Sequence, residues 1–408
     1  MKLWQKVTIG LVSGVIFGLT VKKLEISHYV EYVKPIGDIF INMIKMIVMP
    51  LIFFSIVSGI TSISDSRTLG RVGLKATIAF MVTTTFAIII GLAVSLILKP
   101  GEGVTLNFEQ NLDAEPAKKF DFIKMVVNIV PSNIFETLAS GDTLQIVFFA
   151  IFTGITLNKM NSEYGRRIIS GCQLMAQLVF KMIELIMQIS PYGAFALTSW
   201  VIGTQGIDVL HSLIKLVFAV VFAMGLQYAI FGLLIYFFGG LSPIPFYRKS
   251  FEYQALAFST SSSKAALTTT MKICREKLGI SKTSTSFVLP LGASINMDGM
   301  AIYLGMCAVF FAQATGFNLR LYDYLIVVVT ATLGSIGVAG IPGGSMVMLP
   351  MILSSIGMPI EGVALIAGID RILDMLRTTI NITGDVTITL LVDKSENMLN
   401  VDVYNSKN

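Results

Sequence analysis

Long apolar runs alternate with short polar connections along most of this chain. A helix needs about 20 apolar residues to cross the hydrocarbon core of a bilayer, and every run approaches or exceeds that length. The pattern therefore predicts an all-α polytopic membrane protein with eight transmembrane helices. The runs cover residues 5–21, 36–63, 71–99, 121–158, 164–200, 208–240, 284–316 and 360–393.

Two further apolar segments are interrupted at their middles by small residues. Segment 243–277 is broken at Ser259–Ser263, and segment 325–357 is broken by the glycine-rich stretch 334–345, which contains Pro342. Each half is too short to span a bilayer, and proline and glycine prevent a continuous helix through the second segment. Irregular backbone at membrane depth is tolerated only where protein or a cavity satisfies its polar groups. We therefore expect two re-entrant helical hairpins, an arrangement typical of transporter binding sites.

Polar side chains in the last apolar run concentrate on one helical face. At about 100° per residue they fall within one arc of roughly 100°. Charges at the bilayer centre cost about 2.5–3.5 kcal/mol each on insertion scales, which favours a functional cluster over an idle one. The face consists of Asp370, Asp374, Arg377, Thr378, Asn381 and Asp385.

The chemistry of this face matches an acidic amino acid. Arginine suits bidentate recognition of a carboxylate, and Asp374, one turn from Arg377, suits an ammonium group. The alternative is that these charges pair with one another to hold helices together, and Asp370, at the end of the stripe, is a candidate for that structural role. Arg371 points about 100° away from the stripe, so we expect it to snorkel or to pair with a neighbouring helix and assign it no function.

A second polar cluster interrupts the run at 284–316. Asn296 and Asp298 carry hard oxygen ligands, and Gly292 and Gly299 are expected to permit local unwinding that frees backbone carbonyls. The cluster predicts cation coordination. Hydroxyl oxygens from an earlier run are further candidates, namely those of Thr83, Thr84 and Thr85.

Composition and charge agree with a membrane protein. The 408 residues are 54% hydrophobic and 13% charged, with a mean hydropathy of +0.76, far more apolar than an average soluble domain. The formal net charge of +5 comes from Lys and Arg at alternate connections, which predicts that both termini are cytoplasmic. No basic, aromatic-interleaved surface indicates a nucleic-acid partner. The basic clusters are Lys2/Lys6, Arg67/Arg71/Lys75, Lys159/Arg166/Arg167, Arg248/Lys249 and Lys272/Arg275/Lys277/Lys282.

Two smaller features leave the predicted fold and function unchanged. The first apolar run lacks a small-residue cleavage site and precedes further spans, so we interpret it as a retained helix. Cys172, Cys274 and Cys307 are odd in number and scattered, which favours packing over disulfide or metal roles.

Four motifs, in order along the whole chain, resemble the dicarboxylate/amino acid:cation symporters, the glutamate transporter family. They are the serine-rich tip at 259–263, Asn-Met-Asp-Gly at 296–299, Ala-Gly-Ile-Pro-Gly at 339–343 and the polar helix 370–385. The resemblance implies a symporter rather than an enzyme. It would import aspartate or glutamate with sodium ions by an alternating-access, elevator-like mechanism, as a homotrimer in the plasma (inner) membrane of a prokaryote, with no cofactor beyond the coupled ions.

The same resemblance implies how the chain is divided. Residues 1–70 and 121–207 would form a static scaffold. Residues 71–100 and 208–408 would form the moving transport domain, and residues 101–120 an external loop.

Site residues follow from the resemblance as well. Asp374 would hold the substrate ammonium and Arg377 its side-chain carboxylate. The α-carboxylate would be held by Asn381, Thr378 and the backbone of Ser261, Ser262 and Ser263, and the gate would comprise Val338, Ala339, Gly340, Ile341 and Ser345. Sodium would bind at three places: Gly292, Asn296, Asn381 and Asp385; Thr83, Thr84, Asn296 and Asp298; and the carbonyls of Ser294, Ser335, Ile336 and Val338.

Two positions depart from the family pattern. Met300 stands where a threonine commonly touches the substrate, and Phe80 stands where a tyrosine commonly frames the deep sodium site. Leu304 stands where proton-coupled animal members carry a glutamate; bacterial proton-coupled relatives also lack that acid, so its absence weakens proton coupling without excluding it.

Three alternatives remain beside sodium–amino acid symport. A proton-coupled symporter of amino acids or C4-dicarboxylates is the first, although an unpaired Asp374 would repel a dianion. A serine hydrolase using Ser263 and Lys264 is disfavoured, because adjacent helical residues do not face each other. A passive channel is disfavoured because a site shaped to an amino acid suggests occlusion.

Overall fold

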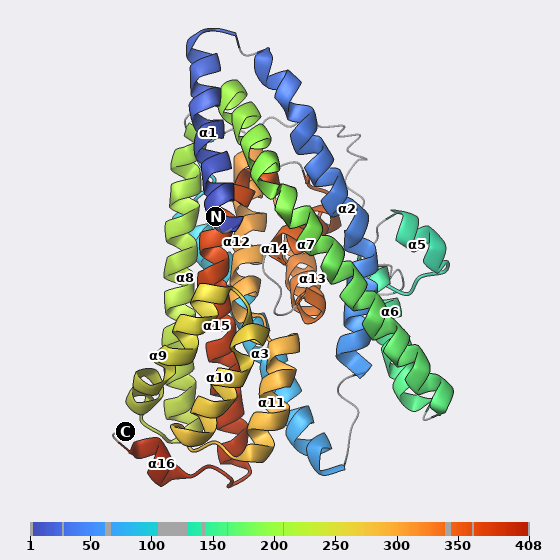
Figure 1. Cartoon of the computed structure of the whole chain (residues 1–408), viewed down its shortest axis with the longest axis vertical. Helices are drawn as coiled ribbons and strands as arrows, with labels where there is room; N and C mark the ends of the chain where they lie inside the picture. The colour runs from blue at the N-terminus through green and yellow to red at the C-terminus, as the bar shows by residue number, and fades with distance from the viewer. Residues whose placement is uncertain are drawn as a thin grey trace.

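A computed structural model describes most of the chain, and every regular element in the described part is helical (Figure 1). Four described stretches are long and apolar enough to cross a membrane: Arg71–Leu98, Glu163–Ile186, Val209–Gly239 and Lys282–Thr315. The predicted all-α architecture is confirmed in the described part, and its long apolar helices are consistent with a membrane protein, whereas the count of eight spans stays a prediction. The described residues are 3–26, 28–61, 67–104, 127, 129–140, 143–160, 162–206, 208–338, 344–360 and 363–406.

The N-terminal helices pack against one long helix. Helices α1 (Leu3–Lys23) and α2 (Tyr29–Thr61) lie along α7 (Glu163–Gln205), and α6 (Thr143–Lys159) lies against α2. Three α1 glycines spaced four apart make the contact with α7 close. A Cβ at Gly10, Gly14 or Gly18 would lie 2.3, 2.7 or 2.8 Å from the backbone oxygen of Pro191, Phe195 or Ser199. Such small-residue spacing lets membrane helices approach at backbone distance.

The predicted single span over 121–158 is wrong. In the described part of that run a short helix, α5 (Ile134–Ser140), precedes α6. Pro131 lies outside both helices, and the Asn133 side chain accepts a hydrogen bond from the Phe135 amide at 3.0 Å, which caps α5. The apolar length of the run concealed this Pro-Ser-Asn start signal.

The C-terminal half is organised around two helices. Helix α15 (Val363–Ser395) packs against α8 (Asp208–Gly239), α11 (Lys282–Ile295) and α12 (Asp298–Thr315). Helix α3 (Arg67–Leu98) lies along α12. Because α12 is buried over nearly its whole length, it forms the centre of the core.

The first predicted hairpin segment breaks where the sequence indicated. Helices α9 (Pro243–Thr260) and α10 (Ser263–Glu276) meet at Ser261, whose φ of 50° is left-handed and ends α9. Ser262 caps α10 by accepting from the Ala265 amide at 3.3 Å. Helices α13 (Leu321–Val338) and α14 (Ser345–Ser355) flank the predicted tip of the second segment, and the re-entrant course of both segments stays a prediction. The predicted tip residues Ala339, Gly340 and Ile341 lie outside the described residues, as do residues 105–120 of the predicted external loop.

The run 284–316 is broken between α11 and α12, at Asn296 and Met297. Asn296 has extended backbone, with φ −92° and ψ 114°. The expected unwinding at Gly292 and Gly299 is wrong, because both glycines lie inside helices. Their role is close approach: a Cβ at Gly292 would lie 2.7 Å from Asp385 Oδ1, and one at Gly299 would lie 2.6 Å from the Arg377 carbonyl oxygen.

The C-terminal segment ties the base of the first hairpin to the rest of the molecule. The buried Lys249 ammonium on α9 donates to the carbonyls of Lys277 (2.8 Å), Val403 (2.8 Å) and Tyr404 (2.9 Å) and to Ser406 Oγ at 3.1 Å. Val403 and Tyr404 belong to the last helix, α16 (Val401–Asn405). Lys249 therefore joins α9, the end of α10 and α16.

Ion pairs join α3 to the end of α15, beside the first hairpin. Glu396, which follows α15, is bonded to Lys75 and to Arg71 of α3. These hydrogen bonds, the one from Lys75 above all, hold the pKa of Glu396 below its ordinary value. The first hairpin and its neighbouring helices are thus fastened together at one end of the molecule.

Lys249→Met should release α16. The substitution leaves three carbonyls without their charged donor, which we expect to lower the free energy of opening this segment by about 3 kcal/mol. Amide hydrogen exchange in residues 401–405 should then be about 100-fold faster, measured by mass spectrometry on the purified protein. Lys272→Met, at an exposed α10 position, is the matched control and should exchange like the wild type. Unchanged exchange in Lys249→Met would contradict the role of the clamp.

Candidate functional site

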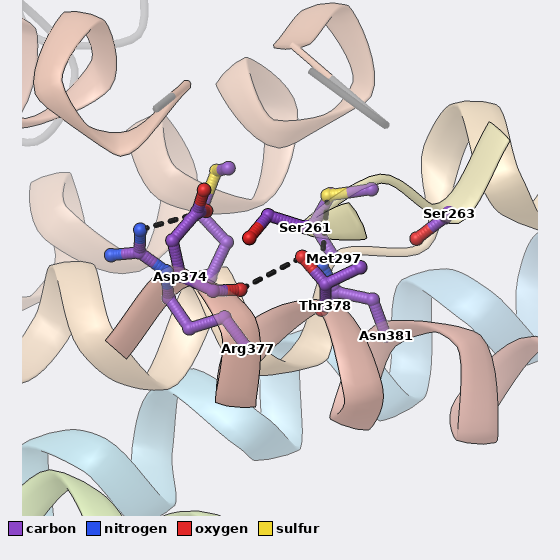
Figure 2. A pocket seen from close by; sticks show the side chains of 8 residues that line it. Ser261, Ser263, Met297, Asp374, Arg377, Thr378 and Asn381 are labelled. Atoms are coloured by element: carbon purple, nitrogen blue, oxygen red, sulfur yellow. Dashed lines mark hydrogen bonds and ion pairs between the residues drawn. The ribbon is translucent and has the colours of Figure 1, made fainter. Parts of the chain in front are cut away.

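A cavity lies where the first hairpin, the α11–α12 break and α15 meet (Figure 2). Seven predicted substrate residues come together there, joined by Met297, whereas Ser262 is absent from the lining and caps α10 instead. The structure thus gathers segments more than 100 residues apart in sequence. The lining residues are Ser261, Ser263, Met297, Met300, Asp374, Arg377, Thr378 and Asn381.

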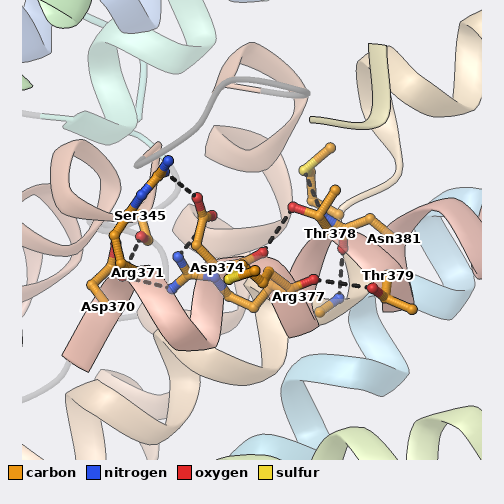
Figure 3. Close-up of polar contacts among 11 residues, drawn as sticks. Ser345, Asp370, Arg371, Asp374, Arg377, Thr378, Thr379 and Asn381 are labelled. Carbon is orange, nitrogen blue, oxygen red and sulfur yellow. Dashed lines mark hydrogen bonds and ion pairs between the residues drawn. The ribbon is translucent and has the colours of Figure 1, made fainter. Parts of the chain in front are cut away.

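Arg377 is the most buried charge in the cavity, with 1% of its side chain exposed. Its guanidinium donates to Asp370 Oδ1 at 2.8 Å and to Asp374 Oδ1 at 2.9 Å (Figure 3). The group also lies 4.2 Å from the centre of the Tyr303 ring, a cation–π distance. Its Nε–H has no partner among the described residues. A buried donor left unpaired costs about 1–3 kcal/mol, so a ligand carboxylate here would be favoured.

Asp370 links the second hairpin to α15. Besides Arg377, its Oδ1 accepts a hydrogen bond from Ser345 Oγ at 2.7 Å. Ser345 is the first residue of α14. The expectation that Asp370 serves as a structural partner agrees with these contacts.

Arg371 departs from the sequence expectation. Its guanidinium donates to Asp374 Oδ2 at 3.1 Å, although its Cα–Cβ bond leaves the helix away from the stripe. A long side chain reaches a neighbour three residues along the same helix. Asp374 therefore lies between two arginines. The premise that it is an unpaired carboxylate is wrong.

A second buried cluster lies deeper in the protein, around two carboxylates. Asp298 accepts from Thr84 Oγ1 at 2.8 Å and from Gln227 Nε2 at 3.3 Å. Asp385 accepts from Asn296 Nδ2 at 3.0 Å. Within the described part of the chain neither carboxylate has an ion-pair partner, and both are at most 1% exposed. Buried charges require compensation, and oxygen-rich sites of this kind bind hard cations.

Asn381 joins the cavity to this cluster. Its Oδ1 accepts from the Gly299 amide at 2.8 Å, its Nδ2 lies 3.2 Å from Met297 Sδ, and its carbonyl accepts from Asn296 Nδ2 at 3.3 Å. One residue thus contacts both helices that flank the break. Thr83, also predicted here, is buried, and its hydroxyl donates to the Phe80 carbonyl at 3.2 Å.

The third predicted cation place is described in part. Ser294 lies in the last turn of α11, and Ser335, Ile336 and Val338 lie in the last turns of α13. Carbonyls at helix ends lack intrahelical donors, so they are available as ligands. The side chains of these three α13 residues lie outside the described residues.

Sequence reasoning missed Gln227 and Gly384. Gln227 is a lone amide in the apolar run 208–240, and polarity inside a membrane helix was the available signal. Gly384 lies against the deep cluster, where a Cβ would be 2.7 Å from Asn296 Nδ2 and 3.0 Å from Asp298 Oδ2. The only signal for Gly384 in the sequence was its position directly before Asp385 in the polar helix 370–385.

Comparison with known proteins gives concordant matches over nearly the full length. The family model described as the sodium:dicarboxylate symporter family matches residues 3–395. The chain is 36% identical over 405 residues to a proton/sodium-glutamate symport protein of Bacillus caldotenax, covering 97% of this chain and 95% of that protein. It is 34% identical over 406 residues to the proton/glutamate-aspartate symporter of Escherichia coli (strain K12), covering 96% and 92%. It is 36% identical over 403 residues to a C4-dicarboxylate transport protein of Bacillus subtilis (strain 168), covering 97% and 95%.

Gly384→Ala should disable the deep cluster while the fold survives. The added methyl would displace Asn296 or Asp298, and both are held by buried hydrogen bonds. We expect the sodium concentration needed for half-maximal thermal stabilisation of the purified protein to rise by about tenfold or more, with choline as the reference cation. Gly225→Ala on α8, where a Cβ meets nothing within 4 Å, should behave like the wild type. An unchanged sodium response in Gly384→Ala would refute the site.

Proposed function

This chain belongs to the sodium:dicarboxylate symporter family, and from that premise we propose that it imports an acidic amino acid, aspartate or glutamate, together with sodium ions. The family is one of transporters and not of enzymes. The observation that carries the proposal is the buried Arg377, whose Nε–H has no described partner in the cavity. Asn381 connects this cavity to Asp298 and Asp385, two buried carboxylates that lack ion-pair partners in the described part. The names of two relatives, a glutamate and a glutamate-aspartate symporter, support the same substrate class.

Each end of the substrate has a partner in the proposed binding mode. Arg377 binds the side-chain carboxylate and Asp374 the ammonium. The α-carboxylate lies by Asn381, Thr378 and the tip formed by Ser261, Ser262 and Ser263. The start of α10 supports this placement, because a helix N-terminus favours anions. The buried Ser263 hydroxyl, which has no partner among the described residues, supports it too.

Sodium occupies three places in this proposal, and charge balance supports the number. In this proposal Asp298 and Asp385 are ionised when the cations are bound and contribute two negative charges, while Asp370, Arg371, Asp374 and Arg377 sum to zero. A substrate monoanion raises the total to three negative charges, which three monovalent cations neutralise. The places are Thr83, Thr84, Asn296 and Asp298; Gly292, Asn296, Asn381 and Asp385; and the carbonyls of Ser294, Ser335, Ile336 and Val338.

Helix packing supports an elevator-like mechanism. Helices α3, α8–α12 and α15 pack mainly on one another around the site, while α1, α2, α6 and α7 pack on one another. We assign the first group, with α13, α14 and α16, to a transport domain (71–100 and 208–408). The second group is the scaffold (1–70 and 121–207), assembled as a homotrimer. The second hairpin, tied to Asp370 through Ser345, acts as the gate and includes Val338–Ile341.

The distribution of basic residues supports a cytoplasmic location for both termini. Arg71 and Lys75 contact Glu396, and Lys249 contacts α16, so these cations gather at the end of the molecule that carries the C-terminus (Figure 1). Positive residues favour the cytoplasmic side. Helix α1 runs from its N-terminus toward the opposite end, where it turns into α2 (Figure 1). We place the protein in the inner membrane of a prokaryote.

A proton-coupled C4-dicarboxylate carrier is the second candidate. The Arg371–Asp374 ion pair favours it, because a neutralised Asp374 does not repel a dianion. The C4-dicarboxylate transport protein among the relatives points to the same substrate class.

Arg377→Ala should abolish uptake. Radiolabelled L-aspartate is offered to proteoliposomes under an inward sodium gradient, an inward proton gradient, or neither. Wild type should accumulate aspartate with the sodium gradient, and Arg377→Ala should lose about 100-fold or more in rate, because a buried carboxylate contact is lost. Arg167→Ala, at an exposed α7 position, is the control and should transport normally. Aspartate uptake driven by the proton gradient alone would show proton coupling and contradict the sodium-coupled proposal.

Aspartate uptake should be electrogenic. Three sodium ions entering with one monoanion carry two net positive charges, worth about 4.6 kcal/mol at 100 mV. An inside-negative potassium diffusion potential, set with valinomycin, should therefore speed sodium-driven uptake and raise its plateau. Voltage-independent uptake would show that charge movement is balanced and would contradict the three-ion stoichiometry.

A further inference from the structure

Arg371 occupies one oxygen of the carboxylate that is proposed to bind the substrate ammonium. Its Nη1 lies 3.1 Å from Asp374 Oδ2, while Arg377 binds the other oxygen, Oδ1, at 2.9 Å (Figure 3). Arg377 and Asp374 are nearly fully buried, whereas Arg371 retains 17% of its side-chain exposure. Arg371 is thus the outermost and most easily displaced member of the cluster.

The charge of the cavity depends on this pair. With Arg371 in place, the two aspartates and two arginines of the cluster cancel. Without it, Asp374 and Asp370 would share Arg377 alone and leave one negative charge beside the ligand. Like charges at close range in a poorly solvated site repel strongly. A dianion could then enter only against an uncompensated carboxylate.

We propose that Arg371 sets the substrate class by standing in for the ammonium group of an amino acid. The inference rests on the proposed function of the same cavity. When the ligand is a C4-dicarboxylate, which has no ammonium, the Arg371 guanidinium stays paired with Asp374 and compensates its negative charge. The transporter therefore accepts C4-dicarboxylates as well as acidic amino acids.

The same residue opposes amino acid binding. A carboxylate has about four acceptor positions, so an ammonium can reach Asp374 while Arg371 is present. Two cations on one carboxylate repel each other, so the ammonium either displaces Arg371 toward solvent or binds less tightly. Removal of Arg371 should therefore separate the two substrate classes. Dicarboxylate binding should weaken, and amino acid binding should stay the same or strengthen. A merely structural ion pair would affect both classes alike.

Calorimetric titration of the full-length protein in detergent, in saturating sodium chloride, tests the proposal. Wild type should bind both L-aspartate and succinate. Arg371→Gln should raise the Kd for succinate about tenfold or more, while the Kd for aspartate stays the same or falls. Arg371→Lys, which keeps the charge, should restore most of the succinate binding. Lys181→Gln removes an exposed cation–carboxylate pair of the same i,i+3 spacing on α7 and should change neither Kd.

The outcomes separate this inference from the proposal on which it rests. Wild type that binds aspartate but not succinate overturns the role of Arg371 and leaves the proposed amino acid transport standing. Equal weakening of both ligands in Arg371→Gln, or unchanged succinate binding, also overturns it. Wild type that binds neither ligand overturns the proposed function, and the inference with it.

Discussion

The burial of the Arg377 guanidinium is the constraint on which the rest of the site depends. A charge with 1% exposure needs compensation, which Asp370 and Asp374 provide from the same helix. Helix α15 must stay regular there to hold all three in register. Tyr303 of α12 covers the guanidinium, and Ser345 of α14 reaches Asp370. One buried cation thus determines how α12, α14 and α15 meet.

The deep carboxylates, Asp298 and Asp385, need compensation by positive charge, whereas the buried Arg377 needs compensation by negative charge. Asp298 and Asp385 receive neutral donors from Thr84, Gln227 and Asn296, and no described cation reaches them. The cavity holds a charge-balanced cluster around Arg377, whose Nε–H has no partner among the described residues, while the deep cluster supplies carboxylate oxygens. Asn381 contacts both flanks of the α11–α12 break between them. Under the proposed function, this shared residue is the physical basis for coupling substrate binding to cation binding.

Backbone breaks and glycines make that proximity possible. The α9–α10 turn at Ser261 brings the first hairpin tip to the cavity, and the Asn296–Met297 break opens the helix beside it. Gly292, Gly299 and Gly384 then let α11, α12 and α15 approach at distances that a Cβ would obstruct. Far from the cavity, Lys249 fastens the base of the same hairpin to α16. The tip is positioned by a framework tied at its far end.

The sequence by itself determined the apolar helices, the break between α9 and α10 and the polar stripe of α15, because each depends on local composition and on one helical period. It could not show that Arg371 reaches back to Asp374, that Gln227 serves Asp298, or that Gly384 lies against Asn296. From the sequence we also expected helix unwinding at Gly292 and Gly299, whereas the helix breaks at Asn296 and Met297. Those features depend on side-chain reach and on contacts between helices distant in the chain. Helical periodicity gives the direction of a Cβ, and only tertiary packing decides what the side chain touches.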